Sequence, residues 1–398
     1  MISKRAKKIK PSATLSLGAK IKELKKRGED VVSLATGEPD FAIPESIKQA
    51  AAAAAKEGFT KYEPTAGIPE LREAICGKFR RDNNLEYTPE NILVSNGGKQ
   101  SLYNLFQVLL DPGDEVIVPV PFWVSYAEMI GLAEGKAVYV KTESLKITAK
   151  DLKKALTPKT KILSLNSPSN PTGLVYTRQE LEALAEICVK NNIIVLSDEV
   201  YEKMVYPAGE PGSGVYDVEH VSIASLGRKI KNLTFVVNSF SKNFGLPGWR
   251  IGYCAGPADA IKAATSLQDH STSGVNSIAQ RAALAALSES DDWFSDVVKE
   301  YGKRRDFMAQ GLKAINGISF QMPQGAFYFF VDISELLQKN PAIKDAVSFC
   351  EALLEKQRVA VVPGNDFGAA DHVRLSFATN MEEIEKGMAR LKEFVNEM

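Results

Sequence analysis

The middle of the chain, from about residue 90 to residue 255, alternates short apolar runs with longer amphipathic stretches. Several of the short runs are apolar throughout, which is typical of strands in a parallel sheet that helices cover on both faces. We expect strands at Ile92-Leu93-Val94, Val116-Ile117-Val118, Ala137-Val138-Tyr139-Val140, Ile162-Leu163-Ser164-Leu165, Ile193-Ile194-Val195-Leu196, Phe235-Val236-Val237 and Ile251-Gly252-Tyr253-Cys254. The alternation predicts an α/β domain with a mostly parallel sheet.

One of the amphipathic stretches, from Thr177 to Lys190, has the period of a helix. Apolar residues recur there at positions 181, 184, 185 and 188, which share one helical face. Thr177 is followed three residues later by Glu180, which is the pattern of a capping box. The helix is therefore expected to begin at this point.

The pattern changes after about residue 290. A long charged helix is expected from Asp291 to about Ile315, followed by a strand over residues 326–331 and a further helix. Two more strands are expected at 359–362 and 373–377, and a terminal helix from Met381. This mixture predicts a smaller α+β domain after the parallel-sheet domain.

Composition and charge exclude several classes of protein. The 398 residues, 44% of them hydrophobic, are enough for two or three domains. Lys+Arg and Asp+Glu both number 49, so no excess charge would draw the chain to nucleic acid or to a membrane surface. No apolar run approaches the roughly 20 residues that a membrane helix needs. We expect neither nucleic acid nor a membrane as a partner.

The cysteines and histidines argue against a disulfide framework and a metal site. The four cysteines are scattered and form no CxxC pair, which suits a reducing compartment and predicts a cytoplasmic protein. The three histidines are too far apart in sequence to have metal-ligand spacing, so we expect no metal. The basic N-terminus is not followed by the apolar block of a secretion signal; a solvated arm is favoured over an organelle transit peptide.

The first candidate for chemistry is the stretch that follows the apolar run 233–237. It carries Ser239, Ser241, Lys242 and, eight positions further on, Arg250. One lysine can hold an aldehyde as an imine, while serine and arginine hold an attached phosphate. The common cofactor that is both an aldehyde and a phosphate is pyridoxal 5′-phosphate. Taken alone, Lys242 would be a surface lysine and Arg250 a surface ion-pair partner.

Further polar clusters follow other predicted strands, and in an open α/β sheet ligands bind at the carboxyl ends of strands. Asn96-Gly97-Gly98-Lys99 opens a helix whose N–H groups can face an anion, although two glycines also make a simple turn. In Ser197-Asp198-Glu199-Val200-Tyr201, Asp198 and Tyr201 would suit a pyridinium nitrogen and the phenolic oxygen beside it. The alternative for Asp198 is a helix cap.

Prolines mark two further points near these strand ends. Ser167-Pro168-Ser169-Asn170-Pro171-Thr172-Gly173 is rich in turn residues and follows the predicted strand that ends at Leu165. Pro171 and Pro121 are candidates for cis peptide bonds, which occur mainly before proline.

Together these motifs resemble those of the class I/II aminotransferases of pyridoxal-phosphate fold type I, in the bacterial branch of the aspartate aminotransferases. The resemblance covers nearly the whole chain. It rests on Lys10-Pro11-Ser12-Ala13-Thr14, Gly37-Glu38-Pro39-Asp40-Phe41, Lys61-Tyr62, Ala66-Gly67-Ile68-Pro69-Glu70-Leu71-Arg72, Asn166-Ser167-Pro168-Ser169-Asn170-Pro171-Thr172-Gly173, the lysine motif, Val362-Pro363-Gly364 and Val373-Arg374-Leu375-Ser376. It implies an N-terminal arm with part of the small domain (1–45), a large domain with a mostly parallel seven-stranded sheet (46–288) and a small α+β domain (289–398).

The resemblance also implies a role for each site residue. Lys242 would form the internal aldimine with pyridoxal 5′-phosphate and shuttle the proton between the substrate Cα and the cofactor. Asp198 would pair with the pyridine nitrogen, and Tyr201 and Asn170 with the phenolic oxygen. Trp123 would stack on the ring, with an ordinary core aromatic as the alternative. The phosphate would be held by Gly97, Gly98, Lys99, Ser239, Ser241 and Arg250, and by Tyr62 of a second subunit, which implies a homodimer with shared active sites.

For the substrate, the resemblance implies that Arg374 grips the α-carboxylate with Asn170, Trp123 and Gly37 assisting. Lys99 would bind the distal carboxylate of aspartate or glutamate; the alternative is that it only helps to hold the phosphate. Two positions depart from the family pattern. Pro247 stands where many relatives have threonine, with little expected effect, and Asp269-His270 places an extra acid where relatives have neutral residues, which argues against acidic substrates.

The expected activity is a ping-pong amino transfer from aspartate or glutamate to 2-oxoglutarate or oxaloacetate. Aromatic amino acids, alanine or prephenate are alternative substrates, and a cysteine-conjugate β-lyase is an alternative reaction on the same residues. A pyridoxal-phosphate-sensing transcription regulator would need a DNA-binding module, for which the nine residues before Lys10 are too few. A nicotinamide dehydrogenase is not favoured, because no G-x-G-x-x-G follows an early strand.

Overall fold

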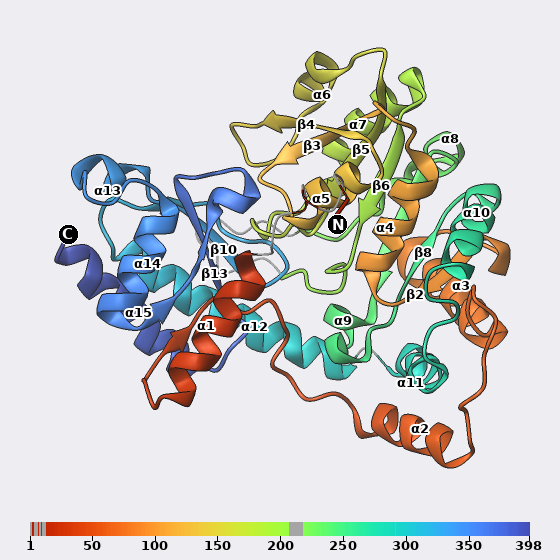
Figure 1. Cartoon of the computed structure of the whole chain (residues 1–398), viewed down its shortest axis with the longest axis horizontal. Coiled ribbons are helices and arrows are strands. Elements are labelled where there is room, and N and C mark those ends of the chain that lie inside the picture. Colours follow the sequence, from red (N-terminus) through yellow and green to blue (C-terminus); the bar gives the residue numbers. More distant parts are fainter. Residues whose placement is uncertain (1, 4–6, 8, 10–12, 207–217, 291) are drawn as a thin grey trace.

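A computed structural model describes residues 2–3, 7, 9, 13–206, 218–290 and 292–398. Two bodies lie side by side in Figure 1, one built around a large sheet and the other around a small sheet with long helices. Asp291 and Lys10-Pro11-Ser12 lie outside the described residues. Among the described residues, no helix is both long and apolar enough to cross a membrane.

The large sheet confirms all seven strands expected between residues 90 and 255. Its spatial order is β2-β8-β7-β6-β5-β3-β4. The last four neighbouring pairs are parallel, whereas β8 runs antiparallel to both β2 and β7. The strands are β2 (Ile92–Ser95), β3 (Glu115–Val120), β4 (Lys136–Lys141), β5 (Thr160–Asn166), β6 (Ile194–Asp198), β7 (Thr234–Ser239) and β8 (Gly252–Ala255).

Helices cover both faces of this sheet, as the apolar strands require. Apolar residues of α4, α5 and α10 pack with β2, β3, β7 and β8 in one buried cluster, and residues of α7 pack with β3, β5 and β6 in another. The capping box predicted at Thr177 and Glu180 begins α7. The helices here are α2 (Glu45–Lys56), α3 (Pro69–Asn83), α4 (Gly98–Leu109), α5 (Ser125–Leu132), α6 (Ala149–Ala155), α7 (Arg178–Asn191), α8 (Arg228–Lys231), α9 (Phe240–Asn243), α10 (Ala258–Asp269) and α11 (Ser277–Ser288).

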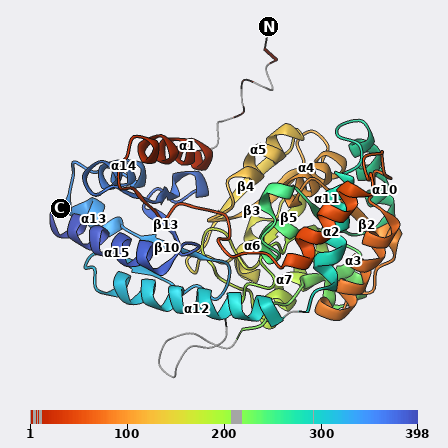
Figure 2. The same cartoon turned by 90° about the horizontal axis from the view of Figure 1, so that it is seen from below.

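The second body is an antiparallel sheet of order β12-β13-β10-β9 with helices packed against it. Figure 2 shows α12 running along its lower side toward the large sheet. The elements are β9 (Ser319–Phe320), β10 (Tyr328–Asp332), β12 (Val362–Pro363), β13 (His372–Ser376), α1 (Ala13–Lys26), α12 (Asp292–Lys313), α13 (Ser334–Lys339), α14 (Ala346–Gln357) and α15 (Met381–Asn396).

The strand expected at 359–362 is divided in two, because its halves pair with different partners. β11 (Val359–Ala360) is parallel to β1 (Val32–Ser33), while β12 is antiparallel to β13. The residue between them, Val361, points into the apolar core. The pairing of β1 with β11 ties the N-terminal segment to the second body, in keeping with the arrangement expected for residues 1–45. The proposed domain boundaries themselves stay a prediction.

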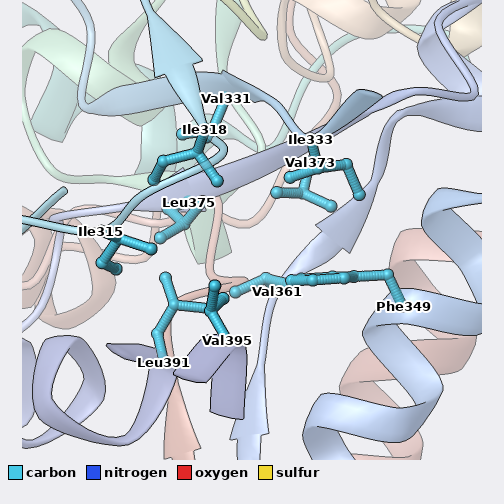
Figure 3. Close-up of a pocket in the computed structure, with 10 residues that line it drawn as sticks. All are labelled: Ile315, Ile318, Val331, Ile333, Phe349, Val361, Val373, Leu375, Leu391 and Val395. Atoms are coloured by element: carbon cyan, nitrogen blue, oxygen red, sulfur yellow. The ribbon is translucent and has the colours of Figure 1, made fainter. Parts of the chain in front are cut away.

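A small cavity lies in the core of the second body (Figure 3). Only apolar side chains line it, contributed by the sheet, by the segment between α12 and β9, by Val361, and by helices α14 and α15. A dry void of this kind belongs to the packing of the core, since it presents no polar group to a ligand.

Candidate active site

The polar residues predicted to act together stand at one edge of the large sheet. Asn166, Asp198 and Ser239 are the last residues of β5, β6 and β7. These three strands are parallel neighbours, so their carboxyl ends meet at the same edge. The amide of Asn166 donates a hydrogen bond to the backbone oxygen of Asp198 at 2.9 Å, which joins the two strand ends.

Asp198 is a buried carboxylate with one oxygen unused. The hydroxyl of Tyr126 donates to its Oδ2 at 2.5 Å, whereas Oδ1 has no partner within the described residues. Burial raises the pKa of Asp198 to about 6. Tyr126 was not predicted as a site residue; its position three residues after Trp123, at the start of α5, is the available signal.

Replacing Asp198 with asparagine is expected to stabilise the ligand-free chain above pH 6. A carboxyl whose pKa is raised from 3.8 to about 6 favours folding while it is protonated, and this contribution is lost as the pH rises through about 6. The gain in the free energy of unfolding is at most about 3 kcal/mol, because each pH unit between the two pKa values contributes about 1.36 kcal/mol. Urea unfolding at pH 7.5 should show it, and the difference should shrink at pH 4. Asp296→Asn, at an exposed position on α12, is the control; an Asp198 variant that is less stable at both pH values would contradict the argument.

Lys242 lies on α9, a single helical turn directly after β7. Its Nζ donates a hydrogen bond to the backbone oxygen of Gly37 and lies 6.0 Å and 5.7 Å from the ring centres of Tyr201 and Phe327. Burial is the main cause that lowers the pKa of Lys242 to about 8; Arg374, Arg250 and Lys99 act in the same direction and Glu38 opposes them. A substantial fraction of this amine is therefore neutral near pH 8 and able to act as a nucleophile or base.

Arg374, on β13 of the second body, reaches the same site. Its guanidinium stacks 4.3 Å from the ring centre of Tyr328 and donates to Asn170 Oδ1 at 2.9 Å and to the oxygen of Ala35 at 3.2 Å. Nε is buried and has no partner within the described residues. The structure thus brings together Arg374 and Asn170, which the sequence analysis expected to share a carboxylate.

Tyr201 is buried, and its hydroxyl lies 2.9 Å from that of Tyr328. Tyr328 was not predicted as a site residue, because it stands inside an apolar strand and is 127 positions away from Tyr201. Its ring joins Tyr201 to Arg374, so it connects the residues expected at the phenolic oxygen and at the carboxylate.

Residues of the kinds that bind anions gather where β2 and β7 end. Gly97, with φ +85°, precedes α4, and a Cβ there would lie 2.7 Å from NH2 of Arg250. Ser239 Oγ donates to Ser241 Oγ at 2.9 Å. Between these pairs lies Gly252, where a Cβ would come within 2.5 Å of the backbone nitrogen of Gly98. Backbone N–H groups at a helix start, two hydroxyls and a guanidinium are suited to a phosphate.

Lys99 and Trp123 meet at the outer side of the site. Nζ of Lys99 lies 5.0 Å from the centre of the Trp123 ring. The rings of Trp123 and Tyr126 are nearly perpendicular, with their centres 5.4 Å apart. Lys99 is exposed overall, yet partial desolvation and then the charge of Arg250 lower its pKa. An anionic ligand bound here would be an ion-pair partner for Lys99.

Other sequence expectations have different outcomes. Tyr62 is 98% exposed, and its role, which needs a second subunit, stays a prediction. Asp269 and His270 are exposed at the end of α10. The bonds before Pro121 and Pro171 are cis, as is the bond before Pro168, which was not predicted.

The chain matches known proteins over nearly its whole length. Residues 29–391 match the family model described as aminotransferase class I and II. The chain is 46% identical to the aspartate aminotransferase of Bacillus sp. (strain YM-2), with 99% of each chain covered. It is also 46% identical to the aspartate/prephenate aminotransferase of Thermus thermophilus, covering 98% of this chain and 97% of that relative.

Two solved structures have the same fold over essentially the full length. The aspartate aminotransferase from Thermus thermophilus with maleate is 46% identical and has a TM-score of 0.91, with 99% of both chains covered. The aspartate aminotransferase from Rhizobium meliloti is 38% identical and has a TM-score of 0.93, with 100% of this chain and 99% of that chain covered.

Proposed function

Because this chain belongs to the class I and II aminotransferases, we propose that it uses pyridoxal 5′-phosphate to move the amino group of L-aspartate or L-glutamate to a 2-oxo acid, 2-oxoglutarate or oxaloacetate. The observation that carries the proposal is the unused, buried Oδ1 of Asp198 at the same sheet edge as the Lys242 amine. A buried carboxylate oxygen needs a donor, and a protonated ring nitrogen is one.

The residues present fit this cofactor. Asp198 would hold the ring nitrogen, Tyr201 and Asn170 the phenolic oxygen, and Trp123 a face of the ring. The phosphate would lie among the Gly97 and Gly98 backbone, Ser239, Ser241 and Arg250, where a side chain at Gly97 would collide with the guanidinium. Tyr62 from a second subunit would complete this group, and its almost full exposure in a single chain supports a homodimer.

Bound pyridoxal phosphate supplies an aldehyde that captures the substrate amine and a cationic ring that withdraws electrons from the Cα–H bond. Asp198, as an anion beside the ring nitrogen, keeps that nitrogen protonated. Lys242, with a pKa lowered to about 8, would be the base that takes the proton from the substrate Cα and holds it for return on the same side. The ring centre of Tyr201 lies 6.0 Å from Nζ of Lys242, so both residues would act on the same bound cofactor.

Arg374 and Lys99 account for a substrate with two carboxylates. Arg374 would take the α-carboxylate through its stacked guanidinium, whose Nε has no partner, while Asn170 orients it at 2.9 Å. Lys99 would take the distal carboxylate. The relatives are named for aspartate, and one was solved with maleate, itself a dicarboxylate. The exposed Asp269 is the feature that favours the alternative of aromatic amino acids or alanine, because an extra acid repels a second carboxylate. Prephenate, a substrate named for another relative, is itself a dicarboxylate and gains nothing from Asp269.

Replacing Lys99 with serine is expected to lower kcat/KM for L-aspartate by about 10- to 100-fold, the size of one charge-assisted hydrogen bond. The value for L-alanine, which has no distal carboxylate, should change by less than about 3-fold. Steady-state kinetics with both amino acids checks this, with Lys229→Ser, at an exposed position, as the control. An equal loss for both substrates would assign Lys99 to the phosphate and not to the substrate.

The half-reaction tests the proposed function. L-aspartate is added to the purified protein loaded with pyridoxal phosphate, with no 2-oxo acid present, and absorption and products are followed. Conversion of the cofactor to its amine form with one oxaloacetate per site supports the proposal. Conversion by an aromatic amino acid or alanine and not by aspartate would keep the amino transfer and overturn the substrate. Pyruvate and ammonia released from a cysteine conjugate without a 2-oxo acid would indicate the β-lyase.

The cysteines bear on where the enzyme works. All four are buried as free thiols, and burial raises the pKa of Cys254 to about 12. Thiols of this kind do not need an oxidising compartment, and we infer a cytoplasmic enzyme from them.

A further inference from the structure

One short segment of backbone touches the side chains at both ends of the site. Residues 35–41, here called the strap, follow β1. The oxygen of Ala35 accepts from Arg374 at 3.2 Å, and the oxygen of Gly37 accepts from Lys242. A Cβ at Gly37 would also lie 3.5 Å from the Tyr328 hydroxyl. The proposed carboxylate ligand and the proposed base are therefore both held by main-chain oxygens of the same segment.

The strap is fixed at its upstream end by strand pairing. β1 is parallel to β11, and the nitrogen of Leu34 donates to the oxygen of Ala360 at 2.9 Å. Between Gly37 and the downstream end lie only Glu38 and Pro39. Proline fixes its own φ and restricts the residue before it. Because this connection is short and stiff, we expect a shift of Asp40 to shift Gly37 as well.

The downstream end is fastened to α12 by Asp40. Its Oδ1 accepts from the Tyr301 hydroxyl at 2.7 Å and from Arg304 NH1 at 2.9 Å, and its Oδ2 from Arg304 NH1 at 2.7 Å. The backbone nitrogen of Asp40 donates to the same Tyr301 hydroxyl at 3.2 Å. Burial is the largest single influence and opposes the charge of Arg304, but Asp40, Glu300 and Tyr301 together outweigh it, so the pKa of Arg304 is raised.

Phe41 adds an apolar contact beside this ion pair. Its ring lies 5.7 Å from that of Trp293 and 6.2 Å from that of Tyr301, both on α12. On its other side, a Cβ at Gly245 would come within 2.7 Å of Phe41 Cε2. The downstream end of the strap thus lies between α12 and the loop that follows Lys242.

We propose that Asp40 is a positioning residue, which with Tyr301 and Arg304 holds the Ala35 and Gly37 oxygens against Arg374 and Lys242. This proposal rests on the proposed function, in which those two side chains bind and deprotonate the substrate. Asp40 itself touches neither the substrate nor the cofactor. Its effect is exerted through the main chain, on the base and on the carboxylate ligand together.

Asp40→Ala is expected to lower kcat by about 10- to 100-fold and to raise KM for L-aspartate, because misplacement by about 1 Å can cost a factor of 10². Arg304→Lys keeps the charge, and because a single nitrogen of Arg304 contacts both Asp40 oxygens, a lysine amine can replace it; this variant should stay within about 3-fold of the parent. Tyr301→Phe removes only the bridging hydroxyl and should lie between the two. Asp296→Ala removes an exposed ion pair from the same helix and is the matched control.

A second readout separates positioning from mere stability. In the full chain without pyridoxal phosphate, the pH dependence of labelling of the Lys242 peptide by acetic anhydride, followed by mass spectrometry, reports the state of that amine. The groups acting on it are Glu38, which favours its charged form, and Arg374, Arg250 and Lys99, which oppose it. Loss of the Gly37 acceptor and displacement of Glu38 both disfavour the ammonium, so the midpoint should move below that of the parent, which is expected near 8.

The outcomes separate this proposal from the proposed function. A lowered labelling midpoint in Asp40→Ala and a smaller shift in Tyr301→Phe support the positioning role, even if aspartate proves not to be the substrate. An unchanged midpoint, with kcat falling only in step with the melting temperature, would show that the contact is structural and would overturn the proposal. If Asp40→Ala does not fold, the Tyr301→Phe and Arg304→Lys comparison decides in the same way.

Discussion

Replacing Lys242 with alanine is expected to abolish amino transfer while leaving the fold intact. Lys242 would be the only group that moves the proton between the substrate Cα and the cofactor, and general acid–base catalysis alone contributes about 10² to 10⁴. The loss of its covalent role adds to this, so kcat should fall by at least about 10⁴-fold. The side chain is half-buried and its amine has a lowered pKa, so its removal costs little stability.

The measurement is single-turnover formation of oxaloacetate from L-aspartate, with the melting temperature taken in parallel. Lys262→Ala, at an exposed position on α10, is the control and should keep full activity. A Lys242→Ala protein that still turned over at more than about a hundredth of the parent rate would refute the assignment of the base.

Replacing Arg374 with leucine is expected to reduce kcat/KM by about 10² to 10³-fold for every amino acid, because each substrate carries the α-carboxylate. Truncating one partner of a buried, hydrogen-bonded charge pair costs about 2 to 5 kcal/mol. Leucine is chosen because the Arg374 side chain lies against the rings of Tyr328 and Phe367, where an apolar side chain can pack. Asn170 and the Ala35 oxygen would lose a donor, so a moderate loss of stability is expected as well.

The test compares L-aspartate and L-alanine as amino donors. Arg374→Leu should lower kcat/KM for both amino acids by similar factors, whereas Lys99→Ser should lower it for aspartate alone. Arg374→Lys is the conservative variant; it keeps the charge but cannot make two parallel contacts, and it should recover only part of the activity. A variant that lost activity toward aspartate but not toward alanine would place Arg374 at the distal carboxylate.

The elements of the large sheet could be predicted because each strand is a short run bounded by turn residues. Asp198 and Lys242 were found for the same reason, since they follow recognisable strands and parallel strands end at one edge. The residues that were missed act through contacts distant in sequence. Tyr126 reaches Asp198 across 72 positions, and Tyr301 reaches Asp40 across 261. No local pattern distinguishes such a tyrosine from an ordinary core aromatic.

The division of residues 359–362 shows a second limit of sequence reasoning. Val359 to Val362 form one uninterrupted apolar run, which predicts one strand. The break at Val361 is decided by the two different partners, β1 and β13. Pairing of this kind depends on the fold of the whole chain and cannot be predicted from the local sequence.

The parallel pair β1–β11 also has a consequence for the chain while it is being synthesised. Val32 pairs with Val359, so the two strands are on the order of 300 residues apart and are made about 15 to 60 s apart at the usual rate of synthesis. Throughout that interval Val32 and Leu34, both fully buried in the finished protein, have no strand to lie against. The large sheet can form during translation, but this seam closes only when the polypeptide is nearly complete. The nascent chain therefore carries an unpaired apolar segment, the kind of surface that chaperones bind.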